Sequence, residues 1–114
     1  MDKTSLAKSF GYAFAGIKVS WQTQRNFRIH IAALAFVILL LVTSHPAAIW
    51  WAVLLLTSGV VIALELVNTA VEKLIDHVHP DQHEIIKIVK DVLAASVLVG
   101  AIAGVGVFVA FLCR

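Results

Sequence analysis

The sequence predicts an all-α integral membrane protein, built as one domain over residues 1–114 from an N-terminal surface helix and three membrane-spanning helices. Hydrophobic residues make up 61% of the chain and charged residues 14%, whereas soluble domains carry about 25% charged residues. The mean hydropathy is +0.94. Two long stretches contain no Asp, Glu, Lys or Arg, and no strand-like alternation stands out. These observations exclude a small water-soluble core, and the formal net charge of +2 does not indicate nucleic-acid binding.

The segment of about residues 4–24 is predicted to form an amphipathic helix at the membrane surface. Large apolar side chains recur every three or four residues and share one helical face: Leu6, Phe10, Phe14, Ile17 and Trp21. The lysines of this segment, Lys8 and Lys18, lie elsewhere on the helical wheel. A helix with this division is typical of one that lies in the interface and does not cross the bilayer.

The first charge-free stretch, between Arg28 and Glu65, is predicted to cross the membrane twice. As a single helix it would be about 54 Å long, far longer than a hydrocarbon core of about 30 Å. Pro46 disfavours helix in the residue before it, so we expect the chain to turn there. The expected spans are about 29–44 and 47–70, with Trp50 and Trp51 as interfacial anchors.

The second charge-free stretch, from Val92 to Cys113, predicts a third span at about 91–113, preceded by a charged collar at about 71–90. Basic residues cluster before the first span and in the collar, whereas the turn between the first two spans has none. By the positive-inside rule, the N-terminus and the collar face the cytoplasm. These basic residues are Lys3, Lys8, Lys18, Arg25, Arg28, Lys73, Lys87 and Lys90.

A polar stripe runs from the second span into the collar. On one continuous helix Glu65, Asn68, Glu72 and Asp76 fall within an arc of about 80°. An ionisable side chain in a membrane helix is a functional hypothesis by default. Carboxylate and amide oxygens suit Mg²⁺, and a neighbouring carboxylate can act as general base on a hydroxyl. With Lys90 near a phosphate, these are the parts of a phosphoryl-transfer site.

Other interpretations fit parts of the pattern. Glu72 and Asp76 could be solvated collar residues paired with Lys73 or Lys87, and Glu65 could serve a proton-coupled transporter. A small non-enzymatic bundle or scaffold would explain the small residues of 100–104. The acidic and histidine-rich segment 76–83 suggests a transition-metal site, but its proline disrupts any helical register. The sequence has no Gly-x-x-x-x-Gly-Lys-Ser/Thr loop. If the chain is a kinase, it is therefore not built on the P-loop fold.

The string Glu65-Leu-Val-Asn68-Thr-Ala-Val-Glu72, followed by Asp76 and by Lys90-Asp91, resembles the prokaryotic diacylglycerol kinase family, which includes the undecaprenol kinases. The resemblance covers nearly the whole chain. It implies a homotrimeric bundle in the inner (cytoplasmic) membrane of a prokaryote, with a cytoplasmic N-terminus and active sites shared between neighbours at the cytoplasmic face. It also implies an ATP- and Mg²⁺-dependent kinase that phosphorylates the hydroxyl of diacylglycerol or undecaprenol, giving phosphatidic acid or undecaprenyl phosphate.

The same resemblance implies a role for each site residue. Glu65 matches the base that deprotonates the lipid hydroxyl, and Asn68 helps to orient the site. Glu72 matches a Mg²⁺ ligand, and Gln24 stands where the family typically has a glutamate that shares the metal. We therefore expect weaker metal binding, or fewer metal ions per site, than in relatives. The positions implied to contact or support ATP are Lys90 and Asp91 at the phosphates, Asp81 and His83 at the adenine end, and Lys8 and Tyr12 on the surface helix.

The lipid substrate is not fixed by the residues. The segment 25–30 looks more like the undecaprenol-using branch of the family than the diacylglycerol-using branch. Both lipids present a hydroxyl at the same depth in the membrane, so both substrates remain open at the level of the sequence.

Overall fold

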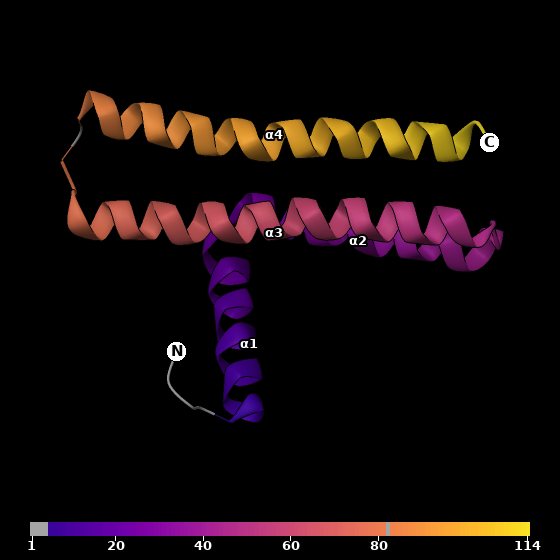
Figure 1. Ribbon diagram of the computed structural model, residues 1–114, viewed down its shortest axis with the longest axis horizontal. Helices are drawn as coiled ribbons and strands as arrows, with labels where there is room; N and C mark the ends of the chain where they lie inside the picture. Colours follow the sequence, from indigo (N-terminus) through magenta and orange to yellow (C-terminus); the bar gives the residue numbers. More distant parts are fainter. Residues whose placement is uncertain (1–4, 82) are drawn as a thin grey trace.

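The computed structural model describes residues 5–81 and 83–114, and these form four helices: α1 (Leu6–Thr23), α2 (Arg25–Ser44), α3 (Ala48–Val78) and α4 (Glu84–Leu112). Figure 1 shows α2, α3 and α4 running alongside one another, with α1 extending crosswise from them. The predicted all-α chain is confirmed, and α2, α3 and α4 are long and apolar enough to cross a membrane. Lys3 and the expected first residue of the surface helix, Thr4, lie outside the described residues.

The bend between α1 and α2 is held by local hydrogen bonds. Helix α1 starts after Ser5, whose hydroxyl accepts a hydrogen bond from the backbone N–H of Lys8 at 3.3 Å. It ends at Thr23; the backbone of the next residue, Gln24, is extended, and α2 begins at Arg25. The guanidinium of Arg28 then donates to the Trp21 carbonyl oxygen at 2.7 Å across the bend. This contact ties the crosswise helix to the first long helix.

The turn between α2 and α3 lies where Pro46 predicts it. His45 adopts a left-handed backbone with φ of 48°, and its N–H donates to the Leu41 carbonyl at 3.2 Å. A left-handed residue followed by proline is a common way to end a helix. Helix α3 starts at Ala48 and continues unbroken through the whole polar stripe to Val78.

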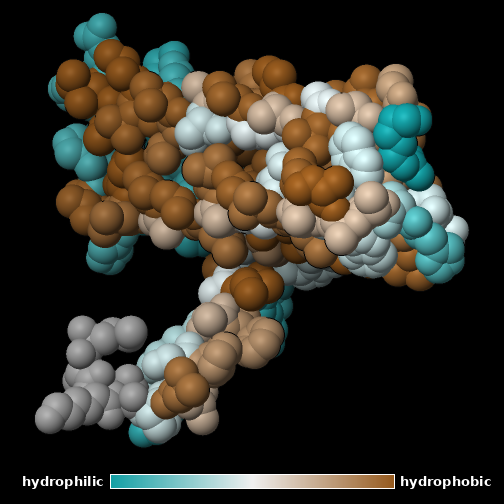
Figure 2. All heavy atoms as spheres, turned by 45° about the vertical axis from the view of Figure 1, so that its right-hand side comes forward, coloured by the Kyte–Doolittle hydropathy of each residue, from teal (hydrophilic) through white to brown (hydrophobic). Residues whose placement is uncertain are grey.

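The best-packed part of the molecule lies around the α2–α3 turn and the C-terminus. Leu41, Leu54 and Phe111 are fully buried there, one from each long helix. Trp50, expected as an interfacial anchor, also packs edge-on against Phe111 at a centroid distance of 5.7 Å. Elsewhere most large apolar side chains are exposed, and Figure 2 shows this apolar surface covering the long helices between more polar ends. Such a surface suits a lipid environment.

Helix α3 contacts each of the other helices, and it approaches α4 closely at Gly100. A Cβ atom added there would lie 3.1 Å from Cδ1 of Leu64. At Gly104 the corresponding distance to Cγ2 of Thr57 is 3.6 Å, and at Gly106 nothing lies within 4 Å. The small residues of α4 therefore serve helix packing at Gly100.

Candidate functional site

The predicted polar stripe occupies one face of α3 and becomes more exposed along the helix. Glu65 is buried, with only 2% of its surface accessible to solvent. Asn68 and Glu72 are half-buried, and Asp76 is exposed. Because α3 runs without a break from the apolar stretch into the collar, the stripe leads from within the helix bundle to its polar end. In Figure 1 this end of α3 and the start of α4 extend beyond the bend between α1 and α2.

Glu65 is enclosed by its own helix and by α2. Oε1 of Glu65 lies 3.4 Å from Nε2 of His30, and the backbone carbonyl of Glu65 accepts a hydrogen bond from the buried Thr69 hydroxyl at 2.9 Å. Burying an ionised carboxylate is costly unless polar partners compensate it. The imidazole of His30 supplies such a partner, and its side chain is 22% exposed.

Asn68 offers an oxygen that has no partner. Its Oδ1 is buried and makes no hydrogen bond with any described residue. A buried acceptor left unpaired destabilises the fold, so a cation at this position would compensate it. Together with the Glu72 carboxylate one turn further on, Asn68 presents the hard oxygen donors that Mg²⁺ prefers.

Residues 5–81 and 83–114 do not bring three His, Cys, Asp or Glu side chains together as a metal-binding group. This finding counts against a transition-metal site in the segment 76–83, but it does not count against a Mg²⁺ site. Magnesium is commonly held by one or two carboxylates together with substrate phosphates and water. A site of that kind requires few protein ligands, and the donors of Glu72 and Asn68 fit it.

The collar lysines form ion pairs that differ from the expected ones. Lys90 contacts Asp76 of α3, with Nζ 2.7 Å from Oδ1, and Lys87 contacts Asp91 at the same distance within α4. The hydrogen bond that Lys90 donates to the Asp76 carboxylate raises the pKa of Lys90, which lies in the collar before the apolar stretch of α4. Asp91 thus pairs with Lys87, although the resemblance implied that it supports Lys90. Lys90 itself is bound to the polar stripe of α3.

The residues expected to contact the nucleotide are spread over α1 and the loop between α3 and α4. Lys8 and Tyr12 are exposed on α1, and Tyr12 lines a hollow of about 450 Å³ between α1 and α3 that Lys73 also lines. Asp81 is exposed in the loop. His83 caps α4, because its Nδ1 accepts a hydrogen bond from the Ile85 backbone N–H at 3.0 Å. Within residues 5–81 and 83–114, no hydrogen bond or ion pair joins the polar stripe to the side chains of Lys8, Tyr12, Asp81 and His83.

Gln24 lies at the bend between α1 and α2. It is half-buried, and its backbone N–H donates to the Ser20 carbonyl at 2.9 Å. Within the described residues, no hydrogen bond joins its side-chain amide to Glu72. Its expected share in metal binding therefore remains a prediction.

His30 is the residue at this site that the sequence patterns did not single out. A search for Asp, Glu, Lys and Arg passes over it, because it lies in a charge-free stretch. The signal was nevertheless present, since His30 is a polar ionisable residue inside a predicted membrane helix, where such residues are rare and usually functional.

Comparison with known proteins adds an independent line of evidence. The family model described as "Prokaryotic diacylglycerol kinase" matches residues 11–112. A diacylglycerol kinase of Synechocystis sp. is 48% identical over 102 residues, covering 89% of this chain and 58% of that protein. An undecaprenol kinase of Bacillus subtilis is 36% identical over 95 residues, covering 83% of this chain and 77% of that protein. The diacylglycerol kinase of Escherichia coli K12 is 26% identical over 102 residues, with coverages of 90% and 84%. The chain thus spans little more than half the length of the Synechocystis relative.

Proposed function

Because the chain belongs to the prokaryotic diacylglycerol kinase family, we propose that it is a lipid kinase that transfers the γ-phosphoryl group of ATP to a lipid hydroxyl. The observation that most supports this proposal is the buried Glu65 carboxylate, set where an apolar helix passes into a charged collar. A transporter would need that acid as well, but it would not need the Asn68 and Glu72 oxygens and the Lys90 cation beyond it.

In the proposed reaction, Glu65 takes the proton from the lipid hydroxyl while the hydroxyl oxygen forms a bond to the γ-phosphorus of ATP. The bond to the bridging oxygen of ATP breaks, and ADP leaves. Lys90 exchanges its contact with Asp76 for the ATP phosphates, with charge-assisted hydrogen bonds in both states. Asn68 and Glu72 would hold Mg²⁺, which when bound neutralises charge that develops on the phosphates.

The lipid would be diacylglycerol or undecaprenol, the two substrates that the names of the relatives print. The more similar of these two relatives is named a diacylglycerol kinase, whereas the segment 25–30 resembles the undecaprenol branch. We further propose that the chain acts as a homotrimer and that its N-terminus and collar face the cytoplasm. In this arrangement the exposed apolar face of α1, which includes Phe10 and Phe14, lies on the lipid.

The test is transfer of ³²P from labelled ATP with Mg²⁺ to lipid in mixed micelles, with diacylglycerol and undecaprenol offered in parallel. We expect label in one or both lipids. Glu65→Gln keeps the shape of the side chain but removes the base, so transfer should fall by about 10²–10⁴-fold.

Glu84→Gln is the matched control, because Glu84 is an exposed carboxylate in the first turn of α4. It should leave the rate within about twofold. A loss of tenfold or less in Glu65→Gln would contradict the role of Glu65 as base. No label in either lipid, from folded wild-type protein, would contradict the kinase and favour the transporter interpretation.

A further inference from the structure

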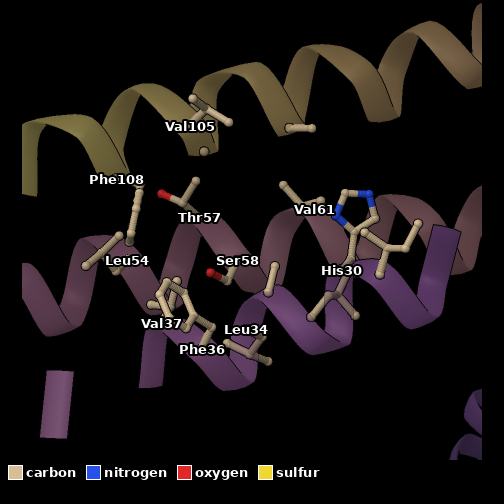
Figure 3. Close-up of a pocket in the computed structure, with 15 residues that line it drawn as sticks. His30, Leu34, Phe36, Val37, Leu54, Thr57, Ser58, Val61, Val105 and Phe108 are labelled. Carbon is tan, nitrogen blue, oxygen red and sulfur yellow. The ribbon is translucent and has the colours of Figure 1, made fainter. Parts of the chain in front are cut away.

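His30 connects the Glu65 carboxylate to an apolar groove. The groove lies between α2, α3 and α4 and has a volume of about 340 Å³. Figure 3 shows His30 at one end of the groove and Leu54 and Phe108 toward the other. Apart from His30, the polar side chains of its lining are Thr57 and Ser58, and Thr57 donates its hydroxyl hydrogen to the Val53 carbonyl at 2.7 Å.

The contact between His30 and Glu65 is the one contact of salt-bridge distance that the Glu65 side chain makes with the described residues, and it is an ion pair only when the imidazole is protonated. Along α3, Asn68 lies about one turn and Glu72 about two turns beyond Glu65. His30 contacts Oε1 of this carboxylate, whereas no ion pair or hydrogen bond within the described residues involves Oε2. In the tautomer that carries the proton on Nε2, the imidazole is a donor 3.4 Å from Oε1.

A general base must lie within hydrogen-bond reach of the proton it removes. A displacement of ~1 Å at a reacting group can reduce the rate ~10²-fold. A carboxylate on a flexible Glu side chain meets this requirement only if another group restricts its rotation. His30 comes from a different helix, so it can fix the carboxylate relative to α2 as well as to α3.

We propose that His30 is a positioning residue that holds the Glu65 carboxylate in the orientation that accepts the lipid proton. This inference rests on the proposed kinase function and adds to it a residue outside the polar stripe of α3. His30 acts through Glu65 and does not itself touch the phosphates. Its removal should therefore lower kcat and leave the KM for ATP nearly unchanged.

The first test compares three variants of His30 in the same transfer assay. His30→Leu removes the donor and should lower kcat by tenfold or more, in line with a displaced base. His30→Gln places an amide N–H near the former Nε2 and should recover much of that loss, whereas the shorter His30→Asn should recover less. His45→Asn is the matched control, because it removes an imidazole from the other end of α2 at a left-handed position that asparagine tolerates.

The second test is a double-mutant cycle with Glu65→Gln. If His30 acts through Glu65, His30→Leu should change the residual rate of Glu65→Gln by less than about twofold, because neighbours that form one unit are not additive. Thermal unfolding in detergent monitors folding. Should His30→Leu fail to fold, the ranking of His30→Gln above His30→Asn still tests the proposal.

The outcomes separate the two proposals. Wild-type protein without lipid phosphorylation overturns the kinase function itself. An active wild type with full kcat in His30→Leu overturns only the positioning role. Equal rates for His30→Gln and His30→Asn, a raised KM for ATP as the main effect, or additive losses in the cycle would each overturn it as well.

Discussion

At the scale of single residues, Gln24 sets this chain apart from the pattern it resembles, in which a glutamate shares the metal. An amide oxygen can bind Mg²⁺ but contributes no negative charge. We therefore expect Gln24→Glu to lower the Mg²⁺ concentration that gives the half-maximal transfer rate. The measurement is a Mg²⁺ titration of lipid phosphorylation at fixed ATP.

A matched control for this prediction is Gln22→Glu, since Gln22 is an exposed residue of α1 two positions away. A negative charge at position 22 should shift the half-maximal Mg²⁺ concentration by much less. Salt screens the interaction between an exposed charge and a metal ion that it does not contact. An unchanged half-maximal Mg²⁺ concentration in Gln24→Glu, or an equal shift in both variants, would show that Gln24 is not near the metal.

Residues that share one helix could be found from the sequence, and pairs between helices could not. The spacing of Glu65, Asn68 and Glu72 fixes their common face, because a helix repeats every 3.6 residues. The contact of Lys90 with Asp76 depends on the register between α4 and α3, which no local sequence pattern determines. The contact of His30 with Glu65 likewise depends on how α2 packs against α3.

At the scale of elements, the close approach of α3 and α4 at Gly100 makes a prediction about stability. Gly100→Leu places a large side chain against Leu64, where even a Cβ atom would lie 3.1 Å from Cδ1. Overpacking of this kind typically destabilises by about 1–3 kcal/mol. We expect a lower midpoint of thermal unfolding in detergent for this variant.

Gly106→Leu is the matched control, because no atom of another described helix lies within 4 Å of a Cβ atom at this position. Both variants lose the same helix-disfavouring glycine, so the difference between them reports the packing against α3. If Gly106→Leu lowers the midpoint as much as Gly100→Leu does, the packing of α3 against α4 is not the cause.

The ends of the helices were predictable where the chain has a strong local signal. Pro46 marks the turn after α2, and the structure places a left-handed His45 before it. The start of α2 was less evident. Arg25 and Arg28 suggest a polar approach to the membrane, but in the structure they are already helical, and the Arg28 guanidinium is satisfied by the Trp21 carbonyl.

At the scale of the whole molecule, the three long helices bring the basic residues to one end. The end of α3 and the start of α4 meet at one end of the long helices because these two helices run antiparallel, and α2 begins on the same side, at the bend that this end extends beyond (Figure 1). Of the basic residues on the long helices and after them, only Arg114 lies at the opposite end, where its guanidinium carbon is 4.0 Å from the Phe111 ring centroid. This division of charge supports the proposed orientation, with the basic end in the cytoplasm.

The orientation can be tested with the single cysteine of the chain, because Cys113 is exposed at the end opposite the collar. A membrane-impermeant maleimide should label Cys113 in intact cells. In a Cys113→Ser background, the thiol introduced by Glu84→Cys at the start of α4 should react only after the cells are permeabilised. Because α4 crosses the membrane between these two positions, they lie on opposite sides, and the reverse labelling pattern would invert the orientation. Labelling of both positions from the same side would contradict a membrane-crossing α4.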